Sequence, residues 1–212
     1  ELKERLEAEG VTVVPHPYLP YAFQISGYDH LSELAAFQEG LFTVQDISSM
    51  LVAEIASPEA GAQVIDVCAA PGGKALHAAE KLMLAEGKRA DGNTNGNANG
   101  NGTRDIFGHV EARDLTETKV ELIRENIERT GLTNISAVCR DASVPDQESV
   151  ESADLVIADL PCSGLGVIGR KPDLKYKASP EGIKSLVMLQ RKILSCVQAY
   201  VKPGGTLVYS TC

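Results

Sequence analysis

The chain has 212 residues, of which 43% are hydrophobic and 23% charged, with a formal net charge of −9. This size and apolar content suffice for one large domain with a substantial core, and they exclude a fibrous repeat or a wholly disordered chain. The acidic balance argues against non-specific binding to polyanions. No apolar run approaches the roughly 20 residues of a membrane helix, so we expect no membrane partner.

The five cysteines are odd in number and irregularly spaced, and none belongs to a CxxC pair. They predict neither a zinc site nor a disulfide scaffold. We therefore expect a reduced, cytoplasmic protein that holds no metal. Cys139 and Cys196 fall within apolar patterns and are predicted to be core residues.

Residues 1–40 predict a helix at 1–9, followed by brief strands and turns at 11–27. This segment is too small for an independent domain, so we interpret it as the α+β remnant of a small N-terminal subdomain. A helix is expected next, with a cap near Asp46.

In the remainder of the chain, strands and helices alternate. Strands are expected at 62–69, 108–114, 134–141, 153–159 and 206–212, and helices at 75–83, 115–131 and 179–201. Ser179 and Pro180 are suited to begin the last helix, and Gly131 to end the one before it. The alternation predicts an α/β domain at 41–212, built on a doubly wound, mostly parallel sheet. The Asn- and Gly-rich residues 91–105 are expected to form a flexible insertion.

The predicted strands end on polar or reactive residues: Asp66, Asp114, Asp141, Asp159 with nearby Cys162, and Cys212. A single acid at a strand end is usually a turn former or a helix cap. Five successive strands that end in this way indicate a ligand site, because the carboxyl ends of parallel strands meet at one edge of a sheet.

The turn after the first of these strands reads Cys68-Ala69-Ala70-Pro71-Gly72-Gly73-Lys74. It leads into a helix whose free N–H groups would face a ligand. The turn matches neither the Walker loop nor GxGxxG, so binding of a nucleoside triphosphate is disfavoured. Asp114 is placed to accept hydrogen bonds from ribose hydroxyls. Together these features favour an adenosine cofactor that carries an amino-acid group instead of phosphates, which is S-adenosylmethionine.

Four segments carry a family resemblance: FTVQDISSM, DVCAAPGGK, DLPCSGLGVIGRKPDLKY and GGTLVYSTC. From about Gly40 to Cys212 the chain resembles the Nop/Sun family of RNA cytosine-C5 methyltransferases, and within it the bacterial branch that acts on small-subunit ribosomal RNA. Leu160, where alanine is common, and the insertion at 91–105 depart from the family pattern. The resemblance implies that residues 1–40 are the remnant of an RNA-binding domain. It also implies that the Rossmann-like methyltransferase fold is truncated after its fifth strand.

The resemblance implies an enzyme that methylates C5 of cytosine in 16S ribosomal RNA through a covalent bond between cysteine and cytosine C6. A transfer RNA or 23S ribosomal RNA is an alternative substrate, and cofactor binding without turnover is an alternative for this chain by itself. The implied roles are cofactor binding for residues Cys68 through Lys74, Asp114, Asp141 and Asp159, catalysis for Asp159, nucleophilic attack for Cys212 and product release for Cys162. Lys74 has three open roles: a loop cap, a contact to the methionine carboxylate, or an RNA contact.

Residues 169–192 contain seven Lys or Arg and only two acids. Taken alone, such a segment is as compatible with a solvated helix face as with a phosphate-binding patch. With the resemblance added, Arg170, Lys171 and Lys175 are predicted to contact RNA. We expect the protein to be a monomer that acts on a single-stranded or flipped base, since the base edge must leave its stack to react.

Two other functions compete with this interpretation. A methyltransferase for proteins or small molecules would need no pair of thiols, so Cys162 and Cys212 disfavour it. Thiol redox chemistry would need the two cysteines within about 6–7 Å at Cα, and the series of strand-end acids disfavours it.

Overall fold

The computed structural model describes residues 1–92, 107–169 and 179–211, which form two compact units. One unit comprises residues 1–44 with 128–131, and the other comprises residues 45–127 with the rest of the chain. Four predicted site residues, Arg170, Lys171, Lys175 and Cys212, and most of the expected insertion at 91–105 lie outside the described residues.

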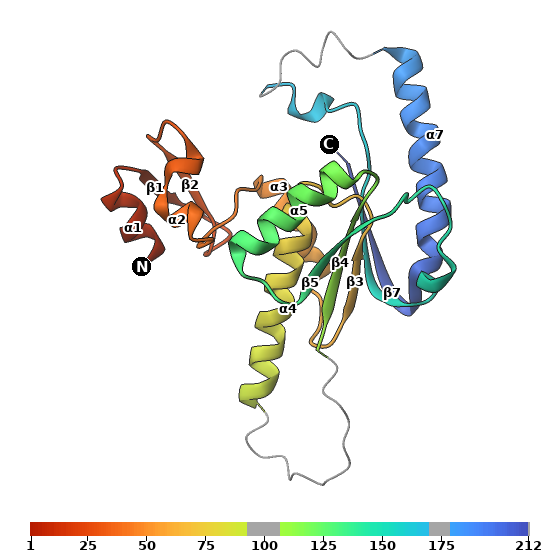
Figure 1. Cartoon of the computed structure of the whole chain (residues 1–212), viewed down its shortest axis with the longest axis horizontal. Coiled ribbons are helices and arrows are strands. Elements are labelled where there is room, and N and C mark those ends of the chain that lie inside the picture. The colour runs from red at the N-terminus through yellow and green to blue at the C-terminus, as the bar shows by residue number, and fades with distance from the viewer. Residues whose placement is uncertain (93–106, 170–178, 212) are drawn as a thin grey trace. The chain divides into compact units, whose positions relative to one another are not determined.

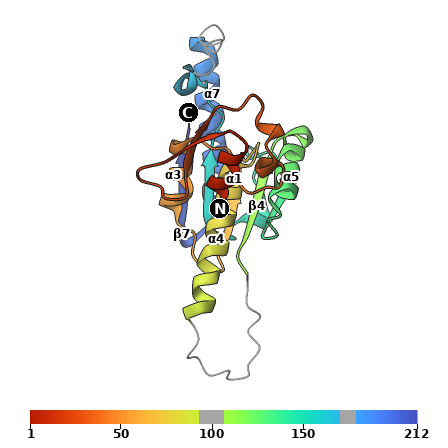
Figure 2. The same cartoon turned by 90° about the vertical axis from the view of Figure 1, so that its left-hand side faces the viewer.

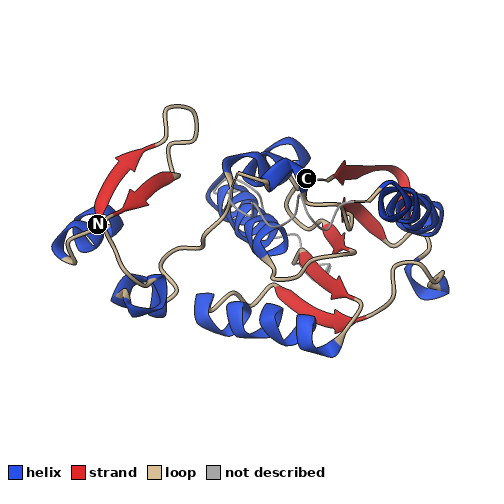
Figure 3. Cartoon of the chain, turned by 90° about the horizontal axis from the view of Figure 1, so that it is seen from above, coloured by secondary structure: helices blue, strands red, loops and turns tan. Residues whose placement is uncertain are grey.

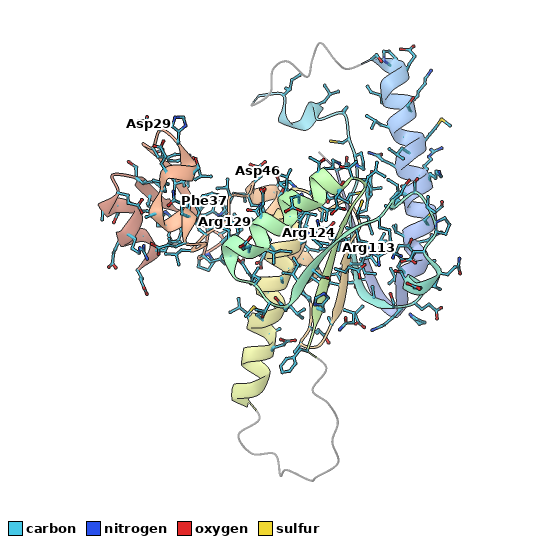
Figure 4. All side chains as sticks on the ribbon, in the orientation of Figure 1. Asp29, Phe37, Asp46, Arg113, Arg124 and Arg129 are labelled. Carbon is cyan, nitrogen blue, oxygen red and sulfur yellow. The ribbon has the colours of Figure 1, made fainter. Side chains whose placement is uncertain are left out.

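The smaller unit is built around an antiparallel hairpin (Figure 1). Its elements are α1 (Leu2–Ala8), β1 (Thr12–Pro15), β2 (Phe23–Ser26), η1 (Leu31–Glu33) and α2 (Ala35–Gln38). Leu6, Val13 and Leu34 are among its buried core residues. The guanidinium group of Arg129 lies 4.0 Å from the centre of the Phe37 ring and donates to the backbone oxygen of that residue, and Figure 4 labels both side chains.

The larger unit contains a parallel sheet with the strand order β5-β4-β3-β6-β7. Its strands are β3 (Gln63–Asp66), β4 (His109–Asp114), β5 (Ile135–Cys139), β6 (Ala153–Asp159) and β7 (Val201–Ser210). Its helices are α3 (Ile47–Ala56), α4 (Gly73–Gly92), α5 (Glu117–Thr130) and α7 (Pro180–Val197), with short η2 (Gln147–Ser149), η3 (Leu165–Val167) and η4 (Gln198–Tyr200). This arrangement confirms the predicted doubly wound α/β fold.

The helices cover both faces of the sheet. Figure 2 looks onto one face, where α3, α4 and α5 lie side by side in front of the strands, and Figure 3 shows α7 on the opposite face. Successive residues of a strand point to opposite faces of the sheet. Val64 and Ile157 pack with α4 and α5 on one face, whereas Ile65 and Val156 pack with α7 on the other. Near-continuous apolar runs in the strands are the consequence of burial on both faces.

The expected helix boundaries follow from local capping. Ser179 accepts a hydrogen bond from the backbone N–H of Gly182 at 3.0 Å, and Pro180 stands in the first turn of α7. After α5, Gly131 adopts the left-handed conformation with φ +68°. Asp46 occupies the N-cap position of α3, as expected.

Three local expectations were wrong. The helix expected to reach Val201 ends at Val197, and η4 leads directly into β7, which begins at Val201 rather than at 206. The cause is a bulge in the pairing of β7 with β6, where Gly205 lies so close to the backbone of Asp154 that a Cβ atom would be 2.9 Å from its oxygen. The helix α4 was expected at 75–83 and instead spans Gly73–Gly92.

The two cysteines predicted for the core behave differently. Cys196 on α7 is buried, which confirms its prediction, but Cys139 is exposed. Cys139 is the last residue of β5, and β5 lies at the edge of the sheet, so it has a neighbouring strand, β4, on one side only.

The strand order reverses between β3 and β6, because β3 pairs with β4 on one side and with β6 on the other. Open α/β sheets bind ligands at such a switch point, beyond the carboxyl ends of the strands. Within the described ranges, no helix is long and apolar enough to cross a membrane.

Two leucines of α4 allow a matched test of the core. Leu82 is completely buried between α4 and the sheet, whereas Leu84 is 63% exposed. Leu82→Ala is expected to lower the free energy of unfolding by about 2–5 kcal/mol, because it leaves a cavity. Leu84→Ala, in the same helix, should change it by no more than about 0.5 kcal/mol. Urea unfolding of both variants checks this, and equal losses would contradict the observed packing.

Candidate functional site

The turn after β3 is held by backbone hydrogen bonds to neighbouring strands. The N–H of Val67 donates to Ile157 on β6 at 3.0 Å, and the N–H of Ala69 donates to Arg113 on β4 at 2.8 Å. Asn126 on α5 donates through Nδ2 to the carbonyl oxygen of Pro71 at 3.1 Å. Gly72, with φ +113°, adopts a conformation that favours glycine, and α4 begins at the next residue. The free N–H groups of the first turn of α4 therefore lie at the switch point.

Asp114, the expected ribose-binding acid, lies against this turn. Its Oδ2 accepts a hydrogen bond from the N–H of Ala70 at 3.0 Å. Its Oδ1 accepts from the N–H of Leu115 at 2.8 Å and from Nζ of Lys119 at 3.0 Å. The fold thus brings together the turn and the acid, which are 44 residues apart in the sequence. A carboxylate offers about four acceptor positions, so these three donors leave room for a ligand hydroxyl.

Lys74 and Asp159 form an ion pair that joins α4 to the end of β6. Nζ of Lys74 lies 2.6 Å from Oδ2 of Asp159. The same ammonium group donates to Ser49 Oγ on α3 at 3.3 Å, and Ser210 Oγ on β7 donates to Asp159 Oδ1 at 2.8 Å. Both charged side chains are mostly buried, so solvent screens the pair less than it screens a surface ion pair. Four elements therefore meet in one charged cluster.

Cys162 lies in the turn that follows β6, and it is disulfide-bonded in the structure, so the expectation of a fully reduced chain was wrong. Its Sγ accepts a hydrogen bond from the N–H of Gly164 at 3.2 Å, and Gly164 makes this turn possible with φ +71°. The turn is attached to β7, because the N–H of Leu160 donates to the carbonyl oxygen of Ser210 at 3.1 Å. In the parallel register, Asp159 is the partner of Ser210. The turn that carries Cys162 therefore lies beside Ser210, the last residue of β7. Ser210 precedes Cys212 by two residues in the sequence.

Asp66 is a buried acid of this site to which the sequence assigned no separate role. Its side chain is completely buried, and burial, with the charges of Asp159 and Asp114, raises the pKa of its carboxyl group to about 7 despite opposing effects of the Cys68 N–H and of Lys74. Oδ1 accepts from the N–H of Cys68 at 3.3 Å. Oδ2 has no hydrogen-bond partner among the described residues.

The other expected cofactor residues have different surroundings. Burial, followed by the charges of Asp66 and Asp114, raises the pKa of the Cys68 thiol to about 12, so this thiol is neutral at physiological pH. Asp141 is exposed, and its Oδ1 accepts from the N–H of Ser143 at 2.8 Å. Asp141 is thus positioned by its own turn.

Several residues of the site were missed by sequence reasoning. Ser49 lies within the motif FTVQDISSM, and Ser210 lies directly before the final Thr-Cys, so motif membership was the only available signal. Asn126 looked like an ordinary helix-surface residue.

An orphan acceptor and an orphan donor border the turn after β3. The acceptor is Oδ2 of Asp66. The donor is Nε2 of Gln45, which is also buried and has no partner among the described residues. Gln45 lies against Gly73, where an added Cβ atom would be 3.8 Å from Cγ of the glutamine. An amino-acid group supplies an ammonium donor and a carboxylate acceptor, which complement these two atoms. The residues therefore fit S-adenosylmethionine.

Comparison with known proteins agrees with this site. A family model described as 16S rRNA methyltransferase RsmB/F matches residues 104–212. Ribosomal RNA small subunit methyltransferase B of Vibrio cholerae is 34% identical over all of this chain and 44% of its own length. The probable ribosomal RNA small subunit methyltransferase B of Bacillus subtilis is 38% identical over all of this chain and 42% of its own length. The chain thus spans less than half of these curated relatives.

Solved structures also resemble this chain in sequence and in fold. NSun6 from Pyrococcus horikoshii with SFG is 30% identical, with a TM-score of 0.68 over 90% of this chain and 44% of that one. A methyltransferase homolog protein from Pyrococcus horikoshii is 26% identical, with a TM-score of 0.75 over 100% of this chain and 59% of that one. Sequence and structure therefore agree that the chain belongs to the RsmB/F family of 16S rRNA methyltransferases, with S-adenosylmethionine as its cofactor.

Proposed function

We propose that the protein containing this chain methylates C5 of a cytosine in small-subunit ribosomal RNA through a covalent enzyme–RNA adduct. The observation that carries the proposal is the register of β6 with β7, which pairs Asp159 with Ser210. This register aligns the turn bearing Cys162 with the strand that leads to Cys212. The family match supports small-subunit ribosomal RNA as the substrate.

The chemistry requires a nucleophile from the protein. C5 of cytosine is too weak a nucleophile to attack a methyl sulfonium unaided, and addition of a thiolate to C6 turns the ring into an enamine-like nucleophile at C5. We assign the thiolate to Cys212. The bound cofactor supplies the electrophilic methyl group.

The Lys74–Asp159 pair fits the other edge of the base. Once a thiolate has added to C6, negative charge develops on the ring, and a proton held at N3 neutralises it. Nζ of Lys74 is a proton donor, and Asp159 beside it is an acceptor for an amino group such as N4 of cytosine. This pairing adds a fourth role for Lys74 to the three that the sequence left open.

Release of the product needs removal of the C5 proton and cleavage of the bond between Cys212 and C6. We assign assistance in this step to Cys162. The N–H of Gly164 holds the sulfur of Cys162 in the turn beside the end of β7, and the assigned role requires the reduced form of Cys162, which is disulfide-bonded in the structure. The two thiols then have opposite duties on one base.

The cofactor would be held by the turn from Cys68 to Lys74 and by the acids around it. Asp114 would receive the ribose hydroxyls, Asp141 the adenine side and Asp159 the reacting end. Asp66 and Gln45 would face the amino-acid group. Backbone N–H groups at the start of α4 would orient its carboxylate.

RNA contacts are proposed for Arg170, Lys171 and Lys175, which lie between two described parts of the chain. An RNA-binding role is likewise proposed for residues 1–40. Because ribosomal RNA is the proposed substrate, we place the protein in the cytoplasm.

Substitution of the two thiols tests the mechanism. Cys212→Ala in the native full-length protein is expected to reduce transfer of labelled methyl groups to unmodified 16S ribosomal RNA by more than about 10³-fold. Cys162→Ala is expected to trap RNA on the protein as an adduct that survives denaturation. Cys139→Ala, at an exposed cysteine of β5, is the control and should behave like the parent. Transfer at the parental rate by Cys212→Ala would refute the nucleophile assignment.

Asp114→Asn tests the cofactor site. The change should weaken binding of S-adenosylmethionine about 10- to 100-fold, because a charged acceptor for the ribose is lost. Asp154→Asn is a matched control at the other end of the sheet, since Asp154 also accepts from a backbone N–H, that of Gln63, and from a lysine, Lys202. Calorimetric titration of both variants measures the affinities, and equal weakening would show that Asp114 acts only through the fold.

Burial of Asp66 predicts a pH-dependent stability. Its pKa is about 7 in the folded state, against an ordinary value of 3.8, so the folded protein binds the proton more tightly. The stabilising effect is fully present below pH 3.8 and is lost as the pH rises through about 7, with a slope of at most about 1.4 kcal/mol per pH unit. Asp66→Asn keeps the acceptor for the Cys68 N–H but does not titrate.

The measurement is urea unfolding of the parent and of Asp66→Asn between pH 4.5 and 8. The free energy of unfolding of the parent, minus that of the variant, should fall as the pH rises. A difference that stays constant over this range would contradict the burial of an uncompensated carboxyl group.

A further inference from the structure

One side chain of α7 connects the two segments that lead to the proposed thiols. Nε2 of Gln190 donates to the carbonyl oxygen of Pro161 at 2.8 Å. Oε1 of the same residue accepts from Oη of Tyr209 at 3.4 Å. Pro161 directly precedes Cys162, and Tyr209 on β7 stands three residues before Cys212 in the sequence. We propose that Gln190 is a positioning residue that fixes the turn bearing Cys162 relative to the end of β7.

This inference deepens the proposed function and rests on it, because the spacing of the two segments matters only if both thiols act on one base. It assigns a role to α7 beyond covering the sheet.

The helix α7 is a firm support for such a contact. Ile193 and Val197 follow Gln190 by three and seven residues, so all three lie on one face of the helix. Both apolar residues are buried against the sheet, with Val156 and Ala158 in the same cluster. In Figure 1 the N-terminal half of α7 continues past the carboxyl ends of the strands. The buried half thus anchors a helix that reaches the edge where the site lies.

Among the described residues, few backbone hydrogen bonds attach this turn to its neighbours. Proline has no N–H, so the carbonyl oxygen of Pro161 is the only backbone hydrogen-bonding group of that residue. On the other side, Leu160 is buried and bonded to Ser210 on β7. Gln190 therefore attaches the turn to α7, in addition to its hydrogen bond with β7 through Leu160. A displacement of about 1 Å at a reacting group can cost 10²-fold in rate.

Glutamine is suited to this place because its amide has a donor and an acceptor on one rigid group. Glutamate has the same shape but would lose the donor to Pro161 and keep the acceptor for Tyr209. Methionine has a similar length and would lose both hydrogen bonds. Tyr209→Phe would lose only the longer one.

Two parts of the proposed cofactor site, the turn after β3 and Asp114, are attached elsewhere. The turn after β3 is bonded to β4, β6 and α5, and Asp114 is bonded to Ala70, Leu115 and Lys119. The two hydrogen bonds of the Gln190 amide reach neither of these sets. Loss of the amide should therefore slow turnover without weakening cofactor binding.

The experiment compares Gln190→Met, Gln190→Glu and Tyr209→Phe in the native full-length protein. Gln198→Met is the matched control, since Gln198 is exposed and its amide donates to the nearby backbone oxygen of Ser195. We measure kcat for methyl transfer to unmodified 16S ribosomal RNA, KM for S-adenosylmethionine, the fraction of denaturation-resistant adduct and the thermal midpoint.

Both Gln190 variants are expected to lower kcat about three- to tenfold, because both lose the hydrogen bond to Pro161, and to raise the adduct fraction. KM for the cofactor should change less than about twofold, and the thermal midpoint should match that of Gln198→Met. Tyr209→Phe should have the smaller effect because its bond is longer. Parental kcat in Gln190→Met would overturn the proposal. A rise in KM or a lower thermal midpoint in place of the kcat loss would also overturn it, since the role would then be structural.

Cys212→Ala is measured in parallel, so that the two proposals fail separately. If Cys212→Ala retains activity, the proposed covalent mechanism fails whatever Gln190 does. If it is inactive and the Gln190 variants are unaffected, only the positioning role fails.

Discussion

The ion pair between Lys74 and Asp159 holds together the two halves of the doubly wound sheet. Strand order reverses between β3 and β6, so α4 and α7, which follow these strands, cover opposite faces. The segments that follow β3 and β6 therefore turn to opposite faces of the sheet at the switch point, where the site lies. The ion pair spans this place from the first turn of α4 to the end of β6, and Ser49 and Ser210 extend it to α3 and β7. The start of α4, which continues the cofactor turn, and the end of β6, which leads to Cys162, are therefore fixed to each other.

Three carboxyl groups share this small volume, and each is accommodated by a different means. Asp114 accepts two backbone N–H groups and pairs with Lys119. Asp159 is neutralised by Lys74. Asp66 has no such partner, and burial instead favours its protonated form. Like charges at close range cannot all remain ionised without a large cost in free energy. Because each carboxyl group is accommodated differently, all three can lie at the same edge of the sheet, where they offer acceptors to the donor groups of a cofactor.

The sheet is covered unequally, and polar residues compensate for the difference. The face that carries α7 has no long described helix over β4 and β5. There Arg113, on β4, donates to Ser149 and Asp146, lies over the ring of Tyr200 and stays almost completely buried. Its backbone oxygen meanwhile receives the N–H of Ala69 from the cofactor turn. A buried cation that is paired and hydrogen-bonded thus links the open half of the sheet to the site.

The sequence by itself determined the alternation of strands and helices, the caps at Ser179 and Gly131, and the glycine turn followed by strand-end acids. These features depend on residues a few positions apart, so local propensity and periodicity reveal them. Tertiary structure alone decided that Lys74 pairs with Asp159, 85 residues away, that Asp66 has an orphan oxygen, and that Gln190 joins the turn after β6 to β7. It also decided that Cys139 is exposed, since edge position is a property of the assembled sheet. The physical reason is that strand order, register and burial arise from packing between distant segments, and no local pattern encodes them.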